Sequence, residues 1–228
     1  MTAEPRVYLR PAARRDRTEF LELMQASRHL HEPWIAPPLG NLSFHGYINR
    51  TQRDDHEGHL VCLKESDALV GVININNIVR GSFLSASLGY YVGAPYAGFG
   101  YMREGLELIK QHAFRTLGLH RLEANIQPDN HASLALVKRC GFTREGLSPA
   151  FLYIAGSWRD HERWTVYDPR TTLHPSEYTT TTPFGSWPSP VSAAAIAAGA
   201  QSLTSCTHAP ARSTAGEPGR PRAAARRR

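Results

Sequence analysis

Cysteine is scarce in this sequence. The chain of 228 residues has three cysteines, Cys62, Cys140 and Cys206, and no two of them stand in CxxC spacing. Paired cysteines are what disulfide-rich secreted domains and most structural zinc sites require. The sequence therefore predicts neither a disulfide framework nor a zinc site, and it favours a reducing compartment such as the cytosol.

Long apolar runs are missing as well. The opening residues, MTAEPRVYLR, lack the apolar core of a secretory signal peptide. The most apolar late stretch, AAAIAAGA at 193–200, is too short to cross a bilayer. We therefore expect a cytoplasmic protein with no membrane partner.

Most of the chain also lacks an excess of charge of one sign. The formal net charge is +6, from 26 basic and 20 acidic residues. From Arg170 onward seven arginines stand against Glu177 and Glu217, which leaves 19 basic and 18 acidic residues before that point. A nearly neutral body does not predict a protein that binds a phosphate backbone. The arginine-rich end leaves a weak contact with RNA open, and a solvated tail without function is the favoured alternative.

Composition divides the chain after YDP at 167–169. Residues 170–228 are rich in Ala, Pro and Arg and show no sustained apolar period. Such a segment cannot bury enough surface to offset the entropy lost on ordering. We predict one domain at 1–169, followed by a disordered tail at 170–228.

Residues 1–169 alternate between strand and helix patterns. Strands are predicted at 7–11, 59–64, 68–76, 83–92 and 120–126. Helices are predicted at 15–30, at 101–117 and from Asn130 to a cap at Gly141, with a proline-broken loop at 31–40. A last hairpin, 151–167, is expected to turn at Ser157 and Trp158. This order predicts a single α/β domain whose mixed, largely antiparallel sheet contains one parallel crossover.

The stretch YVGAPYAGFGYMREGLELIK (91–110) joins a strand to a helix through a glycine-rich turn. A Walker P-loop is excluded because no Lys-Ser/Thr pair follows Gly100. A dinucleotide fingerprint is excluded because Arg103 stands where a glycine or alanine is needed. Two readings stay open from these residues alone: backbone amides that hold a pyrophosphate at the helix N-terminus, or a structural turn that binds nothing.

The flanking stretches resemble the GCN5-related N-acetyltransferase (GNAT) superfamily, and within it the ribosomal-protein-alanine N-acetyltransferases of the RimJ/RimL type. The matching stretches cover essentially all of 1–169 and include VRGSF (79–83), LGYYV (88–92), GYMREGL (100–106), PDNHAS (128–133), KRCGFTREG (138–146) and GSWRDH (156–161). In the pyrophosphate signature, Pro95 stands where Gln or Arg is usual, and Gly98 and Gly100 match. The resemblance implies a mixed, mostly antiparallel sheet, flanked by helices and splayed between two central parallel strands.

The resemblance also implies acetyl-CoA as the co-substrate, lying between strands 83–92 and 120–126. It implies that a bulge points the amide of Val92 at the thioester carbonyl and stabilises the oxyanion. From the residues alone Asn130 or Asp129 caps the helix, and Ser133 is an ordinary residue of its first turn. The resemblance instead places Asn130 and Ser133 at the cofactor, where Ser133 hydrogen-bonds or protonates the leaving thiolate. The implied cofactor contacts are Tyr91, Val92, Gly93, Ala97, Gly98, Phe99, Gly100, Tyr101, Met102, Asn130 and Ser133.

The acceptor amine must be neutral when it attacks. An α-amine with a pKa near ~8 is partly neutral at physiological pH, whereas a lysine with a pKa near ~10.4 is almost entirely charged. A protein N-terminus therefore needs little more than positioning, and a lysine needs a strong base. No compelling base stands out: Leu152 occupies a position where some relatives have Glu, Glu123 is expected in a cross-strand ion pair, and His161 is a minor alternative.

Three residues are implied as acceptor contacts: Glu32 and Trp34 in the loop that follows the first helix, and Tyr153 near the last hairpin. His29 and His31 are expected at the surface, since no paired spacing supports a metal site. The leading hypothesis is an acetyl-CoA-dependent N-acetyltransferase for a protein N-terminus, such as Ala or Ser of a ribosomal protein. The alternatives are transfer to a polyamine or aminoglycoside, and a non-catalytic factor that binds acetyl-CoA or RNA.

Overall fold

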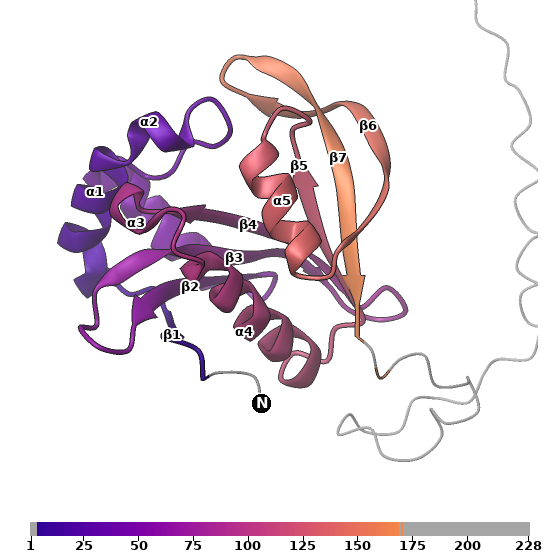
Figure 1. Cartoon of the computed structure of the whole chain (residues 1–228), viewed down its shortest axis with the longest axis horizontal. Helices are drawn as coiled ribbons and strands as arrows, with labels where there is room; N and C mark the ends of the chain where they lie inside the picture. Colours follow the sequence, from indigo (N-terminus) through magenta and orange to yellow (C-terminus); the bar gives the residue numbers. More distant parts are fainter. Residues whose placement is uncertain (1–3, 169, 171–228) are drawn as a thin grey trace, which may run out of the picture. The chain divides into compact units, whose positions relative to one another are not determined.

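A mixed sheet organises the chain. In the computed structural model, which describes residues 4–168 and Arg170, seven strands follow the order β1-β2-β3-β4-β5-β7-β6 (Figure 1). Only the β4–β5 pair is parallel among these neighbours. The predicted α/β fold is confirmed. The strands are β1 (Val7–Pro11), β2 (His56–Leu63), β3 (Leu69–Val79), β4 (Ser85–Val92), β5 (Arg121–Ile126), β6 (Thr143–Ile154) and β7 (Ser157–Tyr167).

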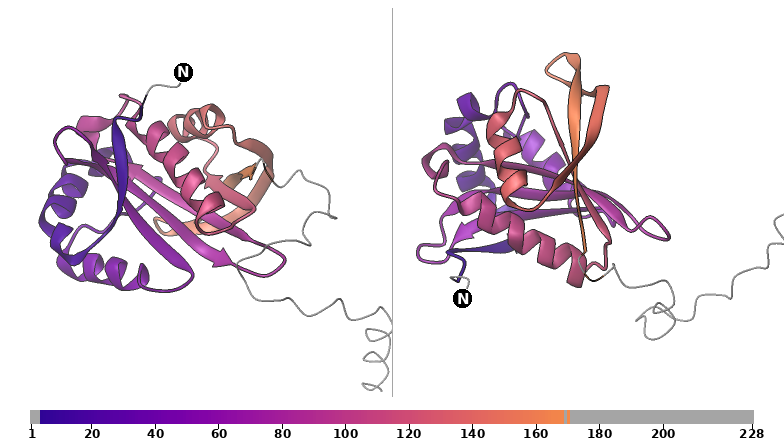
Figure 2. Two further views of the ribbon diagram at one scale, coloured as in Figure 1. Left: turned by 90° about the horizontal axis from the view of Figure 1, so that it is seen from below. Right: turned by 45° about the vertical axis from the view of Figure 1, so that its right-hand side comes forward.

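Helices cover both faces of the sheet (Figure 2). On one face Phe20 and Phe44, from α1 and α3, pack with Val72. On the other face Leu106 and Val137, from α4 and α5, pack with β-strand residues of a second apolar core. The helices are η1 (Arg14–Asp16), α1 (Arg17–Ala26), α2 (Arg28–His31), α3 (Asn41–Arg50), η2 (Ala94–Tyr96), α4 (Tyr101–Arg115) and α5 (His131–Arg139). None of the described helices combines the length and apolar character needed to cross a membrane.

The first helical region differs from the prediction of one helix at 15–30. The chain leaves the helix at Ser27, which is fully buried and accepts the N–H of Ala94 at 2.8 Å through its hydroxyl oxygen. This contact separates α1 from α2 and fastens α2 to the chain just after β4. Helix α3 was not predicted, although its buried residues Phe44, Tyr47 and Ile48 stand at helical spacing; Gly46 in the middle of the stretch lowers its helix propensity.

Strands β4 and β5 separate partway along their length. They pair from Ser85↔Arg121 to Leu88↔Ala124, whereas β4 continues to Val92 and β5 to Ile126. Figure 1 shows β5 turning away from the direction of β4. Beyond Leu88 and Ala124 the backbone groups of β4 and β5 that face each other form no hydrogen bonds between the two strands. The predicted splay between two central parallel strands is confirmed.

The last hairpin turns earlier than predicted. Ala155 and Gly156 connect β6 to β7 with φ angles of 50° and 82°. Two residues with positive φ are what a tight two-residue hairpin requires, and Ser157 and Trp158 instead begin β7. Asp160 fixes this hairpin by accepting the N–H of Ala150 at 2.7 Å.

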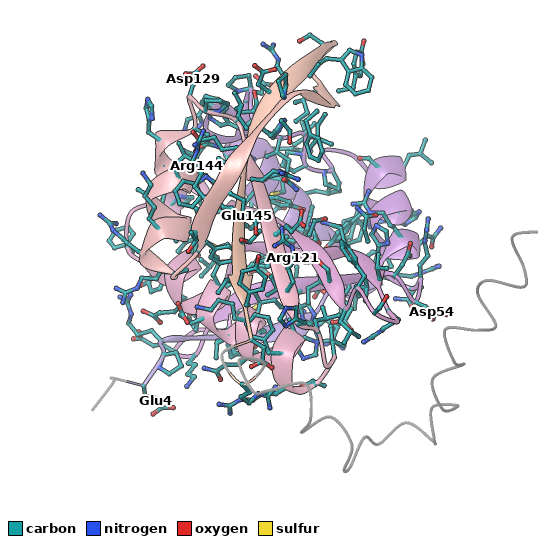
Figure 3. The ribbon with its side chains drawn as sticks, turned by 90° about the vertical axis from the view of Figure 1, so that its right-hand side faces the viewer. Glu4, Asp54, Arg121, Asp129, Arg144 and Glu145 are labelled. Carbon is teal, nitrogen blue, oxygen red and sulfur yellow. The ribbon has the colours of Figure 1, made fainter. Side chains whose placement is uncertain are left out.

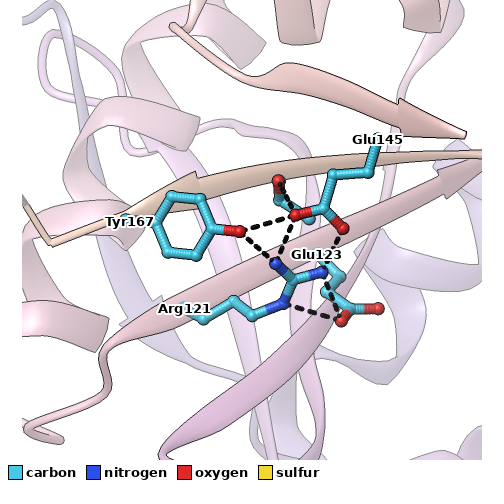
Figure 4. Close-up of polar contacts among 5 residues, drawn as sticks. Arg121, Glu123, Glu145 and Tyr167 are labelled. Atoms are coloured by element: carbon cyan, nitrogen blue, oxygen red, sulfur yellow. Dashed lines mark hydrogen bonds and ion pairs between the residues drawn. The ribbon is translucent and has the colours of Figure 1, made fainter.

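A charged network joins the three strands at the C-terminal side of the sheet (Figures 3 and 4). Arg121 of β5 donates to both carboxylate oxygens of Glu145 at 2.6 Å and to Glu123 at 2.9 Å. Glu145 sits at a register irregularity of β6, which turns its side chain across β7. Glu123 thus forms its ion pair with Arg121 of the same strand, and not across strands as predicted. The cross-strand ion pair of Arg121 is with Glu145.

This network makes stability dependent on pH. The hydrogen bond from Arg121, with those from Tyr167 and Thr165, lowers the pKa of Glu145 from 4.5 to about 2. A carboxyl whose pKa is lower in the folded state stabilises the fold above its unfolded pKa and loses that effect as the pH falls through the folded value.

We expect Glu145→Gln to unfold more easily than the wild type at pH 7, by about 1 kcal/mol because solvent screens the partly exposed carboxylate. The difference should shrink between pH 4.5 and about 2, the interval over which Glu145 becomes protonated. Urea denaturation at a series of pH values measures this, with exposed Glu65→Gln as the control. A difference that stays constant down to pH 2 would contradict the assignment.

Candidate active site

A cavity of about 630 Å³ lies where β4 and β5 separate. Its walls come from α2 and the following loop, the second half of β4, the glycine turn, the end of β5 and the start of α5. Of the predicted cofactor contacts, the lining includes Tyr91, Val92, Ala97, Gly98, Gly100, Tyr101, Met102, Asn130 and Ser133.

The glycine turn presents the N-terminus of α4 to this cavity. Gly98 and Gly100 both have φ of 84°, a left-handed conformation that favours glycine. Helix α4 begins directly afterwards, so its first amides are free of intrahelical partners. Arg103 and Arg139 also line the cavity and add positive charge. Free amides, a helix N-terminus and two guanidinium groups together suit a phosphate-bearing ligand.

Arg6 holds the outer side of the turn. Its guanidinium donates to the carbonyl oxygen of Phe99 at 2.8 Å and to Glu104 at 2.6 Å, and it lies 4.5 Å from the centre of the Tyr101 ring. Phe99 itself is exposed and stacks on Tyr101. Its side chain is outside the cavity lining, so any contact that Phe99 makes there is through the backbone.

The backbone of Val92 faces away from β3. Gly93 donates its N–H to Val70 at 2.7 Å, and Val92 pairs with Gly71 in the alternate position of the ladder. In an antiparallel pair such alternate residues turn both backbone groups outward. The N–H of Val92 therefore points to the side on which β5 has separated, and its carbonyl accepts a hydrogen bond from Nε2 of His31 at 2.8 Å.

The bulge expected at this point is absent from the β3–β4 pairing, which is regular from Gly71↔Val92 to Asn76↔Ser87 in the described chain. That expectation was wrong. The amide is freed because β5 diverges, so no inserted residue is needed. Gly93 pairs with β3, and the side chain of Leu23 occupies the space where its Cβ would be.

Ser133 forms a hydroxyl pair that the sequence did not suggest. Its Oγ lies 2.6 Å from the hydroxyl oxygen of Tyr90, and its N–H donates to Oδ1 of Asn130, which caps α5. Burial raises the pKa of Tyr90 above its usual range, so the phenol stays protonated. Tyr90 was missed as a site residue, although its place in β4 beside Val92 and its alternation with Leu88 offered a signal.

The predicted acceptor contacts are dispersed. Trp34 lines the cavity, and its carbonyl accepts from Gln127 at 3.3 Å. Glu32 is exposed in an ion pair with Arg28 at 2.6 Å, and Tyr153 packs against Trp158 in the last hairpin. Neither Glu32 nor Tyr153 belongs to the described residues that line the cavity.

Two histidines lie in the cavity wall. His161 is buried, with Nδ1 2.9 Å from the carbonyl oxygen of Arg159, and burial lowers its pKa. His31 is also buried, at 4% exposure, and burial lowers its pKa too. The prediction that His31 lies at the surface was wrong, because the break at Ser27 turns α2 onto the end of β4. His29 is exposed, as predicted.

A second pair of histidines lies away from the cavity. Oε2 of Glu57 accepts from Nε2 of His59 at 2.8 Å and from Nε2 of His112 at 2.7 Å, which lowers the pKa of Glu57 to about 2. These are ligand types for a divalent metal, with donor atoms within 4.8 Å of one another. Spacing along the sequence could not reveal the cluster, since Glu57 and His112 are 55 positions apart. In the structure the carboxylate of Glu57 is hydrogen-bonded by the ring N–H groups of His59 and His112.

Comparison with known proteins agrees with this geometry. Residues 6–143 match the acetyltransferase (GNAT) domain family. The match covers more than half of the chain, and the chain belongs to this family. It is an acetyl-CoA-dependent N-acetyltransferase, and acetyl-CoA supplies the acetyl thioester. The glycine turn, the two arginines and the cavity volume fit this co-substrate.

Three similar proteins define the relationship more closely. The Escherichia coli (strain K12) ribosomal protein uS5-alanine N-acetyltransferase is 32% identical over 164 residues, covering 68% of this chain and 84% of the relative. The Vibrio cholerae spermidine N(1)-acetyltransferase is 24% identical over 159 residues, covering 68% and 90%. The structure of Mycobacterium smegmatis RimJ in complex with CoA-disulfide superposes with a TM-score of 0.66 at 28% identity, covering 73% of this chain and 84% of that one.

We expect Ser133→Ala and Tyr90→Phe each to lower kcat by roughly a hundredfold, the lower end of the range typical of losing a general acid. The KM for acetyl-CoA should change little, because the turn amides and arginines are untouched. Steady-state release of the CoA thiol measures both constants, and Ser82→Ala, in an exposed turn, is the control. Unchanged kcat in both variants would remove the hydroxyl pair from the mechanism.

Proposed function

We propose that this protein transfers the acetyl group to the α-amine of a protein N-terminus that begins with alanine or serine, with ribosomal proteins as the first candidates. The observation that carries this proposal is the charge of the cavity. Among the described residues that line it there is no aspartate or glutamate, and the permanent charges are those of Arg103 and Arg139.

A cavity of this kind disfavours a polycation. A polyamine carries several positive charges, and desolvating them without carboxylate partners is costly. An N-terminal α-amine, with a pKa near ~8, enters partly as the neutral form and needs no carboxylate. The relative named as a uS5-alanine N-acetyltransferase supports the same choice, and the spermidine acetyltransferase is the relative that argues against it.

The residues fall into three proposed roles. The amides of residues 98–102 hold the pyrophosphate, with Arg103 and Arg139 nearby, whereas the N–H of Ala97, also predicted as a contact, donates to the carbonyl oxygen of Ala94 at 3.3 Å. The outward-facing N–H of Val92 hydrogen-bonds the thioester carbonyl and the oxyanion that develops there. Ser133, hydrogen-bonded to Tyr90, supplies a proton to the departing thiolate. The side chains of Asn125, Asn130 and Trp34 complete the walls of the cavity.

Three earlier expectations stay predictions. The cytoplasmic location is one of them. The other two, the disordered tail at 170–228 and its weak contact with RNA, fall on residues that lie outside the described part of the chain, apart from Arg170. That residue donates to the carbonyl oxygen of Phe114 at 2.8 Å and pairs with Asp168.

A panel of acceptors tests the proposal. We expect release of the CoA thiol with peptides that begin with Ala or Ser, and kcat/KM at least tenfold lower with spermidine, an aminoglycoside or an N-blocked lysine peptide. N-terminal acetylation of the peptide is checked by mass spectrometry. Faster turnover of spermidine than of every N-terminal peptide would overturn the assignment of the acceptor and leave the acetyltransferase activity standing.

A further inference from the structure

The hydrogen bond between His31 and Val92 determines where His31 carries its proton. The carbonyl oxygen of Val92 can only accept, so Nε2 of His31, 2.8 Å away, must carry the hydrogen in the neutral ring. Nδ1 is then the nitrogen with the lone pair. The ring of Tyr91 packs edge-on against the imidazole at 5.6 Å and holds its orientation.

This Nδ1 is a buried acceptor without a donor. Among the buried side-chain nitrogen and oxygen atoms of the described residues, only Nδ1 of His31 and Oδ1 of Asn125 have no hydrogen-bond partner. Both residues line the same cavity. Buried polar atoms are rarely left unpaired in a native protein, and those that are commonly mark a site that a ligand completes. Because both atoms accept, the missing partners are hydrogen-bond donors, and the N–H groups of the co-substrate and of an acceptor amine are of this kind.

The two atoms lie on different walls. Asn125 belongs to β5, along which the cofactor arm is expected to run, and the amides of acetyl-CoA can supply its donor. His31 belongs to α2, on the side of Trp34 and the loop implied as the acceptor groove.

We propose that Nδ1 of His31 binds the acceptor amine and is the base that receives its proton. This inference rests on the proposed function, because it requires an amine as acceptor. Charges around His31 are few: His29 on α2 is exposed, Arg28 and Glu32 neutralise each other, Tyr91 on β4 is protonated, and His161 on β7 and Arg103 on α4 line the same cavity. Burial lowers the pKa of His31, which keeps the lone pair available near neutral pH.

The proposed step balances as follows. The amine nitrogen forms a bond to the acetyl carbon, and the carbonyl electrons move to the oxygen, which accepts from the N–H of Val92. The proton that leaves nitrogen goes to Nδ1 of His31, giving an imidazolium. The carbon–sulfur bond then breaks, and the sulfur takes a proton from the Ser133 hydroxyl. Water exchange returns the imidazolium and the serine to their starting states, so the net products are an N-acetyl amide and the CoA thiol.

The matched variant is His31→Gln. A glutamine amide can still donate to the carbonyl oxygen of Val92, so the end of β4 stays in place, but it cannot accept a proton near pH 7. We expect kcat with an alanine-starting peptide to fall tenfold to a hundredfold at pH 7, with acetyl-CoA binding and the melting temperature little changed. His29→Gln, two positions away on an exposed side chain, should behave as the wild type.

The pH profile separates a base from a merely structural residue. In the wild type, kcat/KM should fall at low pH through two ionisations, that of the peptide amine and, below the usual histidine range, that of His31. The Gln variant should keep the first and lose the second. His161→Asn, which retains a donor toward Arg159, tests the other histidine of the cavity.

The outcomes are distinct. Loss of the lower ionisation in His31→Gln alone supports the proposal. Normal kcat and an unchanged profile in that variant overturn it, and so does loss of that ionisation only in His161→Asn. If the wild type acetylates no N-terminal peptide, the proposed function fails. The same comparison is then run with whichever amine of the panel is acetylated, so that the role of His31 is still decided.

Discussion

Strands β4 and β5 share hydrogen bonds only as far as Leu88 and Ala124, and the rest of the site depends on this interruption. A parallel pair that continued to Val92 would have used the amide of Val92 in the ladder and left no room between the strands. Because β5 instead leaves with β7 and β6, the backbone facing the gap needs other partners. The carbonyl of Val92 finds one in His31, and the amide faces the cavity.

Contacts from distant parts of the chain fix the positions of the elements around the gap between β4 and β5. Ser27 and His31 bind the chain at Ala94 and Val92, so α2 is attached to the end of β4. Arg6, at the start of β1, binds Phe99 and Glu104 and orients the glycine turn. On the far side the Arg121–Glu145 pair keeps β5 joined to the last hairpin. Each contact bridges segments that are distant along the chain.

Charge is distributed unevenly along the cavity. Its permanent charges are those of Arg103 and Arg139, and we propose that they lie near the phosphates of the co-substrate, whereas Tyr90, Ser133 and His31, to which we assign proton transfer, are neutral. Burial keeps the phenol protonated and the imidazole unprotonated, since both charged forms would lose their hydration. One physical effect thus prepares a proton donor and a proton acceptor in the same cavity.

Local pattern was sufficient for the order of strands and helices and for the glycine turn, because strand alternation, helical spacing and the positive φ of Gly98 and Gly100 are properties of short segments. It failed at Ser27, where a tertiary hydrogen bond ends the helix, and at the last turn, where the backbone conformation of Ala155 and Gly156 decides the position. It also missed α3, because Gly46 lowers the local helix propensity. The resemblance of motifs identified acetyl-CoA, and the family match agrees.

The sequence by itself determined the fold class and the position of the glycine turn, and the resemblance of its motifs singled out Val92 and Ser133, which line the same cavity. Tertiary structure decided which groups meet across long separations: Tyr90 with Ser133, 43 positions apart, and His31 with Val92, 61 apart. It also decided that the cavity is free of carboxylates in the described chain, and that His31 is buried with an unpaired nitrogen. Burial and hydrogen-bond pairing depend on the whole packed domain, and no short stretch of sequence encodes them.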